Sequence, residues 1–244
     1  DVLQPEGGSF KSMVNSLDNW KSINQKYASH FKANGIQGAY YEIWNDPDIY
    51  NLFFTGSVND YCELYKYAAE GIKEGDADAM VGGPSIYGNY DYFTTWLDYI
   101  LKNNVPADYV SFHAYETWGE KVKTIRNELT TRNVNHLPLI LTGWASFNME
   151  DPNQTSFNCP IEKSTSSMRF FRDARSFIKL HDVVEVQWSQ YRDAMWKIDN
   201  TWESAFDKFG LLTIENQRKP LFNAMKLYGW MPIDRYEVSP DSIK

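Results

Sequence analysis

The sequence has little of what several protein classes require. Its 244 residues contain two cysteines, Cys62 and Cys159, which are either free thiols or one bridge and are too few for a disulfide scaffold or a four-cysteine zinc site. The four histidines are scattered, and without an H-x-x-x-H or C-x-x-C pattern we expect no metal site. No run approaches the roughly 18 apolar residues of a membrane span. No G-x-G-x-x-G follows a predicted strand, and we expect no cofactor.

Positive charge is also scarce. The chain has 24 basic and 32 acidic residues, a net charge of −8, and no run rich in Lys or Arg. This balance argues against nucleic acid as a partner. The N-terminal DVLQPEGGSF has no signal-peptide pattern, while the sequon Asn153-Gln154-Thr155 favours secretion weakly.

Aromatic side chains are abundant at 16%, with nine Trp and sixteen Tyr. They have two interpretations. One is a large aromatic core, which composition alone favours. The other is a sugar-binding cleft, because the apolar C–H faces of sugar rings stack on aromatic planes.

Helical and strand patterns alternate along the chain. Amphipathic spacing predicts helices, and short apolar runs predict strands. An irregular segment is expected at 147–163, and FGLL, 209–212, precedes the last helix. The predicted helices are 16–34, 60–74, 90–103, 118–133, 164–180 and 219–229, and the predicted strands are 36–45, 79–86, 108–116, 137–146 and 183–191.

This alternation predicts an α/β fold with a parallel sheet covered by helices, either an open doubly wound sheet or a closed barrel. Polar and aromatic residues gather where strands end, as in Trp44-Asn45-Asp46 and His113-Ala114-Tyr115. Barrel enzymes place their sites at this end. No repeat or linker marks a boundary, so we expect one domain over 1–244.

A set of motifs in one order carries a family resemblance. Glu42-Ile43-Trp44-Asn45-Asp46-Pro47-Asp48 resembles the fourth-strand motif of clan A retaining glycosidases, specifically family 39, which includes β-xylosidases and α-L-iduronidases. Later segments resemble the same family's following strands: Val81-Gly82-Gly83-Pro84, Ser111-Phe112-His113-Ala114-Tyr115, Leu141-Thr142-Gly143-Trp144 and the eighth-strand Trp188. The resemblance implies a TIM (β/α)8 barrel of the glycoside hydrolase type.

Three departures from the family pattern matter. The acid/base position holds Asp46 instead of Glu, and the nucleophile position holds Gly143 instead of Glu. The matched region begins after the family's third strand, so we expect an incomplete barrel with strands four to eight.

Of these departures, glycine at the nucleophile position 143 is expected to cost the most activity. Retaining hydrolysis needs two carboxyl groups about 5–5.5 Å apart. Asp46 keeps an acid but shortens its reach, and small misplacements can cost about 10²-fold. Gly143 offers no attacking group, and loss of a nucleophile can cost about 10⁶-fold.

Other carboxylates are weaker candidates. Glu42 lies four residues deeper than Asp46, roughly 13 Å along the strand, and we expect a buried, paired glutamate. Glu116 follows a strand end, and an inverting route through Asp46 and Glu116 stays open. The plainer interpretation of Glu116 is a surface residue.

The resemblance implies sugar contacts at better preserved positions. Asn45 would form a hydrogen bond with the sugar 2-hydroxyl, although an asparagine in such a position also caps turns. His113 and Tyr115 would line the site, and Trp188 would be the sugar platform. Trp44 and Glu116 complete the candidate substrate-binding set.

The sequence thus predicts a carbohydrate-binding protein of the family 39 type, disabled for retaining hydrolysis by natural decay or by engineering. The alternatives are an active O-glycosyl hydrolase that uses Asp46 with another carboxylate, and a structural or assembly protein. We expect an oligosaccharide or glycoside ligand and a secreted or extracytoplasmic location. A copy or partner chain could complete the barrel, because exposed sheet edges invite pairing.

Overall fold

A computed structural model describes residues 3–115, 118–145, 167–168, 170–171, 183–188, 196–198, 201–203, 210–213 and 215–230. By its contacts the chain divides into two compact units. The first comprises Asp1–Ala145 with Leu180–Trp188, and the second comprises Ser146–Lys179 with Ser189–Lys244. The expectation of one domain stays a prediction.

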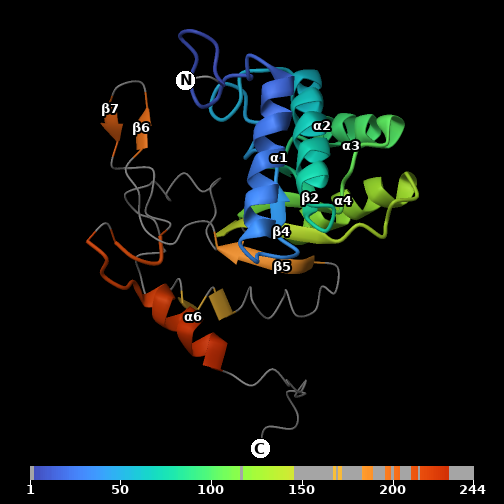
Figure 1. The fold of residues 1–244 in the computed structure, drawn as a ribbon. Coiled ribbons are helices and arrows are strands. Elements are labelled where there is room, and N and C mark those ends of the chain that lie inside the picture. The colour runs from blue at the N-terminus through green and yellow to red at the C-terminus, as the bar shows by residue number, and fades with distance from the viewer. Residues whose placement is uncertain are drawn as a thin grey trace, which may run out of the picture. The chain divides into compact units, whose positions relative to one another are not determined.

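The first unit is built on one five-stranded parallel sheet in the order β1-β2-β3-β4-β5. The strand order follows the chain order, as in a (β/α) barrel, and five such strands make a half-barrel (Figure 1). The expected barrel architecture is thereby confirmed. The strands are β1 Tyr40–Glu42, β2 Met80–Ile86, β3 Tyr109–Tyr115, β4 Leu139–Ala145 and β5 Val183–Trp188.

Four helices of this unit pack along the outer side of the sheet (Figure 1). Side-chain caps begin three of them. Ser16 accepts a hydrogen bond from the Asn19 N–H, Ser57 and Asp60 form a capping box, and Asn89 accepts from the Tyr92 N–H. The helices are α1 Leu17–Ala33, α2 Val58–Gly75, α3 Tyr90–Asn103 and α4 Trp118–Thr131.

Within the described residues, predicted and observed boundaries agree closely except at the first strand. The predicted irregular segment 147–163 and most of the predicted helix 164–180 lie outside the described residues. The predicted strand 36–45 shortens to Tyr40–Glu42, because Trp44 and Asp46 adopt positive φ values that a regular strand does not allow. In the described residues no helix is both long and apolar enough to cross a membrane.

Aromatic residues fill the space between helices and sheet. Tyr61, Tyr65, Trp96 and Phe112 are almost fully buried, and the Tyr65 and Trp96 rings meet edge to face at 5.2 Å. Each such side chain contributes roughly 1.5–3 kcal/mol of hydrophobic stabilisation. Much of the aromatic excess is therefore core. Cys62 is a buried free thiol of α2, and burial raises its pKa to about 12. Cys159 lies outside the described residues.

The second unit contains an antiparallel hairpin of β6 Trp196–Ile198 and β7 Thr201–Glu203, and the helix α6 Pro220–Trp230. The hairpin was not expected from the sequence. Within FGLL, 209–212, Leu212 forms one antiparallel bridge with Arg218.

Glycines let α1 and α2 approach closely. A Cβ atom at Gly71 would lie 2.4 Å from the backbone oxygen of Lys21, and one at Gly75 would lie 2.2 Å from that of Gln25. Both obstacles are backbone atoms of α1, which can move away only if the whole helix moves.

We therefore expect Gly71→Ala to lower the free energy of unfolding by about 1–3 kcal/mol, although alanine is intrinsically the better helix former. Gly119→Ala is the matched control, since its Cβ atom would meet nothing within 4 Å, and it should be neutral or stabilising. Urea denaturation of both variants checks this. Equal stability of the two variants would contradict the close approach.

Candidate active site at the strand ends

The loop after β1 continues the pairing with β2 beyond the regular strand. The Ile43 N–H donates to the Gly82 oxygen at 3.0 Å, and the Asp46 N–H donates to the Ser85 oxygen at 3.2 Å. The Tyr61 hydroxyl holds the same loop by donating to the Ile43 oxygen at 2.8 Å. Asp46 is thereby fixed beside the carboxyl end of β2.

Asp48 ties this loop to the start of α3. Its carboxylate accepts the backbone N–H groups of Tyr87, Gly88 and Asn89 at 2.9, 2.9 and 2.8 Å. Three charge-assisted bonds from consecutive amides make a rigid clamp. In the sequence, the signal for this role of Asp48 is its place two residues after Asp46.

Three buried polar side chains form a chain at this end of the sheet. The His113 Nδ1 lies 2.7 Å from the Asp46 Oδ1, at ion-pair distance but without the alignment of a hydrogen bond. The His113 Nε2 lies 2.9 Å from the Ser85 hydroxyl. Ser85, His113 and Asp46 are 0%, 5% and 6% exposed, so the imidazole ring is held from both nitrogens.

The environment of His113 favours its charged form. Burial lowers the pKa of the imidazole, but the contact with Asp46 and the charges of Glu42 and Asp48 outweigh it and raise the pKa above the usual 6.5. An imidazolium beside Asp46 is an ion pair shielded from water. Asp46 then provides a counter-charge to His113.

Ser85 was missed by the sequence analysis. Its φ of 55° is rare for a residue other than glycine, and the register of β2 on β3 shifts around it. The order Ser–His–Asp is that of a nucleophilic triad, but the Ser85 hydroxyl is fully buried and its N–H donates to the Ser111 hydroxyl at 3.1 Å. We infer that Ser85 anchors the ring.

Gly143 lies directly against His113. The two residues pair in register between β4 and β3, after a shift that leaves Thr142 without a partner on β3. This bulge turns Gly143 toward the face that His113 occupies. A Cβ atom at Gly143 would lie 2.6–2.9 Å from three ring atoms of His113, so the imidazole fills the space that a side chain at 143 would need.

Two other predicted site residues, Asn45 and Trp44, differ in their exposure and contacts. Asn45 is exposed, and its amide donates to the Asp46 Oδ2 at 3.1 Å. The Trp44 indole donates to the Phe53 oxygen at 3.0 Å and packs edge to face on Phe54, so it serves the hydrophobic packing under the loop.

Three candidates are not described as side chains. Tyr115 and Trp188 end β3 and β5, and the backbone of Trp188 pairs with that of Trp144. Glu116 lies outside the described residues. Within the described ranges, no group of three or more His, Cys, Asp or Glu side chains is arranged to hold a metal ion.

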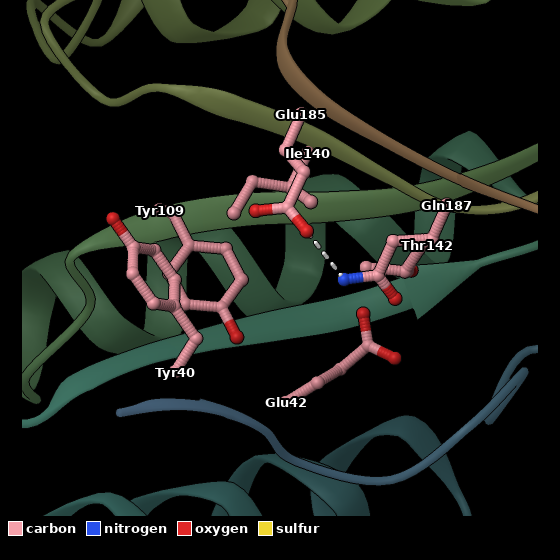
Figure 2. Close-up of a pocket in the computed structure, with 7 residues that line it drawn as sticks. All are labelled: Tyr40, Glu42, Tyr109, Ile140, Thr142, Glu185 and Gln187. Atoms are coloured by element: carbon pink, nitrogen blue, oxygen red, sulfur yellow. Dashed lines mark hydrogen bonds between the residues drawn. The ribbon is translucent and has the colours of Figure 1, made fainter. Parts of the chain in front are cut away.

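An open pocket of about 240 Å³ lies on the inner face of the sheet, lined by side chains of β1, β3, β4 and β5 (Figure 2). Glu42 is half-buried in this pocket and forms no ion pair in the described part of the chain. The expectation of a paired Glu42 stays a prediction. Burial and the charges of Glu42 and Glu185 raise the pKa of Tyr109 in the same pocket.

A parallel half-barrel with polar side chains at its strand ends has the arrangement in which barrel enzymes place their sites. The sequence profile of glycosyl hydrolases family 39 matches residues 11–236. The chain belongs to this family.

Relatives in the family are longer. The chain is 26% identical over 255 residues to a β-xylosidase of Caldicellulosiruptor saccharolyticus, covering 91% of this chain and 48% of the relative. It is 26% identical over 239 residues to a β-xylosidase of Geobacillus stearothermophilus, covering 86% and 45%. The chain therefore spans about half the length of these curated relatives.

Solved structures support the fold. A monomeric β-xylosidase of Caulobacter crescentus CB15 superposes with a TM-score of 0.73 at 20% identity, over 91% of this chain and 48% of that one. A GH39 enzyme of Xanthomonas axonopodis pv. citri gives 0.71 at 21% identity, over 91% and 47%.

The electrostatics of His113 can be measured directly. We expect its NMR titration midpoint to lie above 6.5 in the native protein. In Asp46→Asn the midpoint should fall below 6.5, because burial remains while the main opposing charge is gone. A midpoint that Asp46→Asn leaves unchanged would contradict the pairing.

The raised pKa also predicts the pH dependence of stability. Because the pKa of His113 is higher in the folded protein than in the unfolded one, protonation of this ring stabilises the fold. The stabilisation is complete below the unfolded-state pKa and is lost as the pH rises through the folded-state pKa. His113→Gln should therefore be more destabilising at pH 6 than at pH 9. Urea denaturation at the two pH values checks this, with His136→Gln at an exposed position as the matched control.

Proposed function

We propose that this chain is a sugar-binding segment of the family 39 type in which retaining hydrolysis is disabled. The observation that carries the proposal is position 143, where a glycine meets the His113 ring. A retaining enzyme needs a carboxyl group across from its acid/base residue, about 5–5.5 Å away. Here an imidazole fills the space beside the nucleophile position.

The state of Asp46 supports the same proposal. A general acid must carry a proton toward the leaving oxygen, whereas Asp46 is buried and paired with His113 at 2.7 Å. Using Asp46 as an acid would require the pair to break first. The site therefore departs from the retaining mechanism at both catalytic positions.

The proposed ligands are β-xylosides and xylo-oligosaccharides, because the curated relatives are named β-xylosidases. Asn45 is the described residue best placed to contact such a ligand, since it is exposed beside Asp46. The alternatives, turnover through another carboxylate and a purely structural role, give different experimental outcomes.

We expect calorimetry to detect binding of xylobiose or xylotriose. Asn45→Ala should weaken that binding about tenfold, the loss of one net hydrogen bond. Asn127→Ala, at an exposed position of α4, should leave it unchanged. Absence of heat with every xylo-oligosaccharide would favour the structural role.

Hydrolysis of aryl β-xylosides should stay below about 10⁻⁴ of a typical turnover near 10 s⁻¹. Faster release of the aryl group by the unaltered chain would favour an active hydrolase.

Replacing the glycine should not restore hydrolysis. We expect Gly143→Glu to remain inactive and to lose about 1–3 kcal/mol of stability, because its Cβ atom collides with the His113 ring. Gly143→Ala should show the same loss of stability, which separates the collision from the added charge. Hydrolysis by Gly143→Glu at unchanged stability would show that only the nucleophile is missing.

A further inference from the structure

The pocket on the inner face of the half-barrel is separate from the strand-end site. Glu42 precedes Asp46 by four residues, so it lies deeper along the sheet, in register with Gly82 of β2 and, through it, with Tyr109 of β3. Figure 2 shows the carboxylates of Glu42 and Glu185 on either side of the Gln187 amide in this view. The side chains that matter are Tyr40, Glu42, Tyr109, Thr142, Glu185 and Gln187.

Hydrogen-bond acceptors in this pocket outnumber the donors. The Glu42 Oε2 and the Thr142 Oγ1 are buried and lack a hydrogen-bond partner among the described residues. Glu185 receives one bond, from the Gln187 amide at 2.8 Å. Among the described residues, the lining includes two carboxylates and no basic side chain. Buried acceptors without donors are costly, so the pocket is chemically suited to a cation with several N–H groups.

The aromatic walls narrow the choice of cation. The Tyr40 and Tyr109 rings lie 5.5 Å apart at one end of the pocket. A guanidinium group is planar, carries five N–H donors, pairs with carboxylates and stacks on aromatic faces. An ammonium group offers three donors and no plane for stacking.

The neighbouring sheet edge indicates how such a group would arrive. β1 pairs with β2 on one side, and its other side has no partner strand in the described ranges. Tyr40, at the start of this edge strand, is 56% exposed. An extended segment added to an open edge gains main-chain hydrogen bonds and points alternate side chains to one face.

We propose that the inner pocket binds the guanidinium group of an arginine carried by an extended polypeptide segment that pairs with β1. The Glu42 and Glu185 carboxylates neutralise the guanidinium, the Thr142 hydroxyl accepts one of its N–H groups, and the tyrosine rings cover its plane. This inference is independent of sugar binding at the strand ends.

The charge requirement can be tested with small probes. We expect n-butylguanidinium, which copies the arginine side chain, to bind the whole chain in calorimetry. n-Butylurea has nearly the same shape without the charge and should bind at least about tenfold more weakly. Equal binding of the two probes, or equal binding of n-butylammonium, would overturn the assignment to guanidinium.

Variants locate the binding. Glu42→Gln and Glu185→Gln should each weaken n-butylguanidinium binding about tenfold or more, and Thr142→Val should weaken it less. Glu120→Gln, at an exposed carboxylate of α4 that pairs with Lys123, should have no effect. If Glu42→Gln does not fold, Glu185→Gln and Thr142→Val decide the question. Unchanged binding in those two would place the ligand elsewhere.

A third comparison tests whether the arginine is carried by an extended segment that pairs with β1. A five-residue peptide of alternating Val and Thr with a central arginine should bind more tightly than n-butylguanidinium, because edge pairing adds to the contacts of the side chain. The same peptide with citrulline, the uncharged counterpart of arginine, should lose this binding. If the arginine peptide binds no better than n-butylguanidinium, the pocket takes small cations and the strand-pairing part is wrong.

Discussion

The candidate active site depends on the buried pair of His113 and Asp46. Removing two such groups from water is costly unless they are paired and hydrogen-bonded, and here they lie 2.7 Å apart with Ser85 at the other ring nitrogen. The surrounding backbone is arranged to hold them. Asp46 and Ser85 both adopt positive φ values, and Asp48 clamps the loop after β1 to the start of α3.

Gly143 and the pair of His113 and Asp46 depend on each other. A glycine leaves room for the imidazole ring, and the ring in turn lies 2.7 Å from the Asp46 carboxylate. The absence of a side chain at 143 therefore allows the His113 ring to occupy this place beside Asp46. The proposed loss of hydrolysis follows from this local arrangement.

The second feature of the half-barrel is the pocket on its inner face. In a closed barrel, inward side chains of the strands fill the interior in layers. Here Glu42, Thr142 and Glu185 line an open pocket, and two of their oxygens have no donor in the part of the chain that the structure describes. The proposed arginine would supply the missing charge and donors. The strand-end site and the inner pocket thus differ in the ligand chemistry that each can accept.

The sequence alone determined the order and type of the elements that build the five-stranded sheet and its four helices, because amphipathic helices alternating with short apolar strands predict a parallel sheet covered by helices. It did not predict the hairpin of β6 and β7. Motif order also identified the family and the positions of Asp46, His113 and Gly143. The sequence could not determine which side chains face one another. Register shifts at Ser85 and Thr142 change the alternation of their strands, and the neighbouring glycines signal such irregularities without fixing their position. Only the tertiary structure decided that the His113 ring lies over Gly143 and that Ser85 anchors it, because those contacts join residues from different strands.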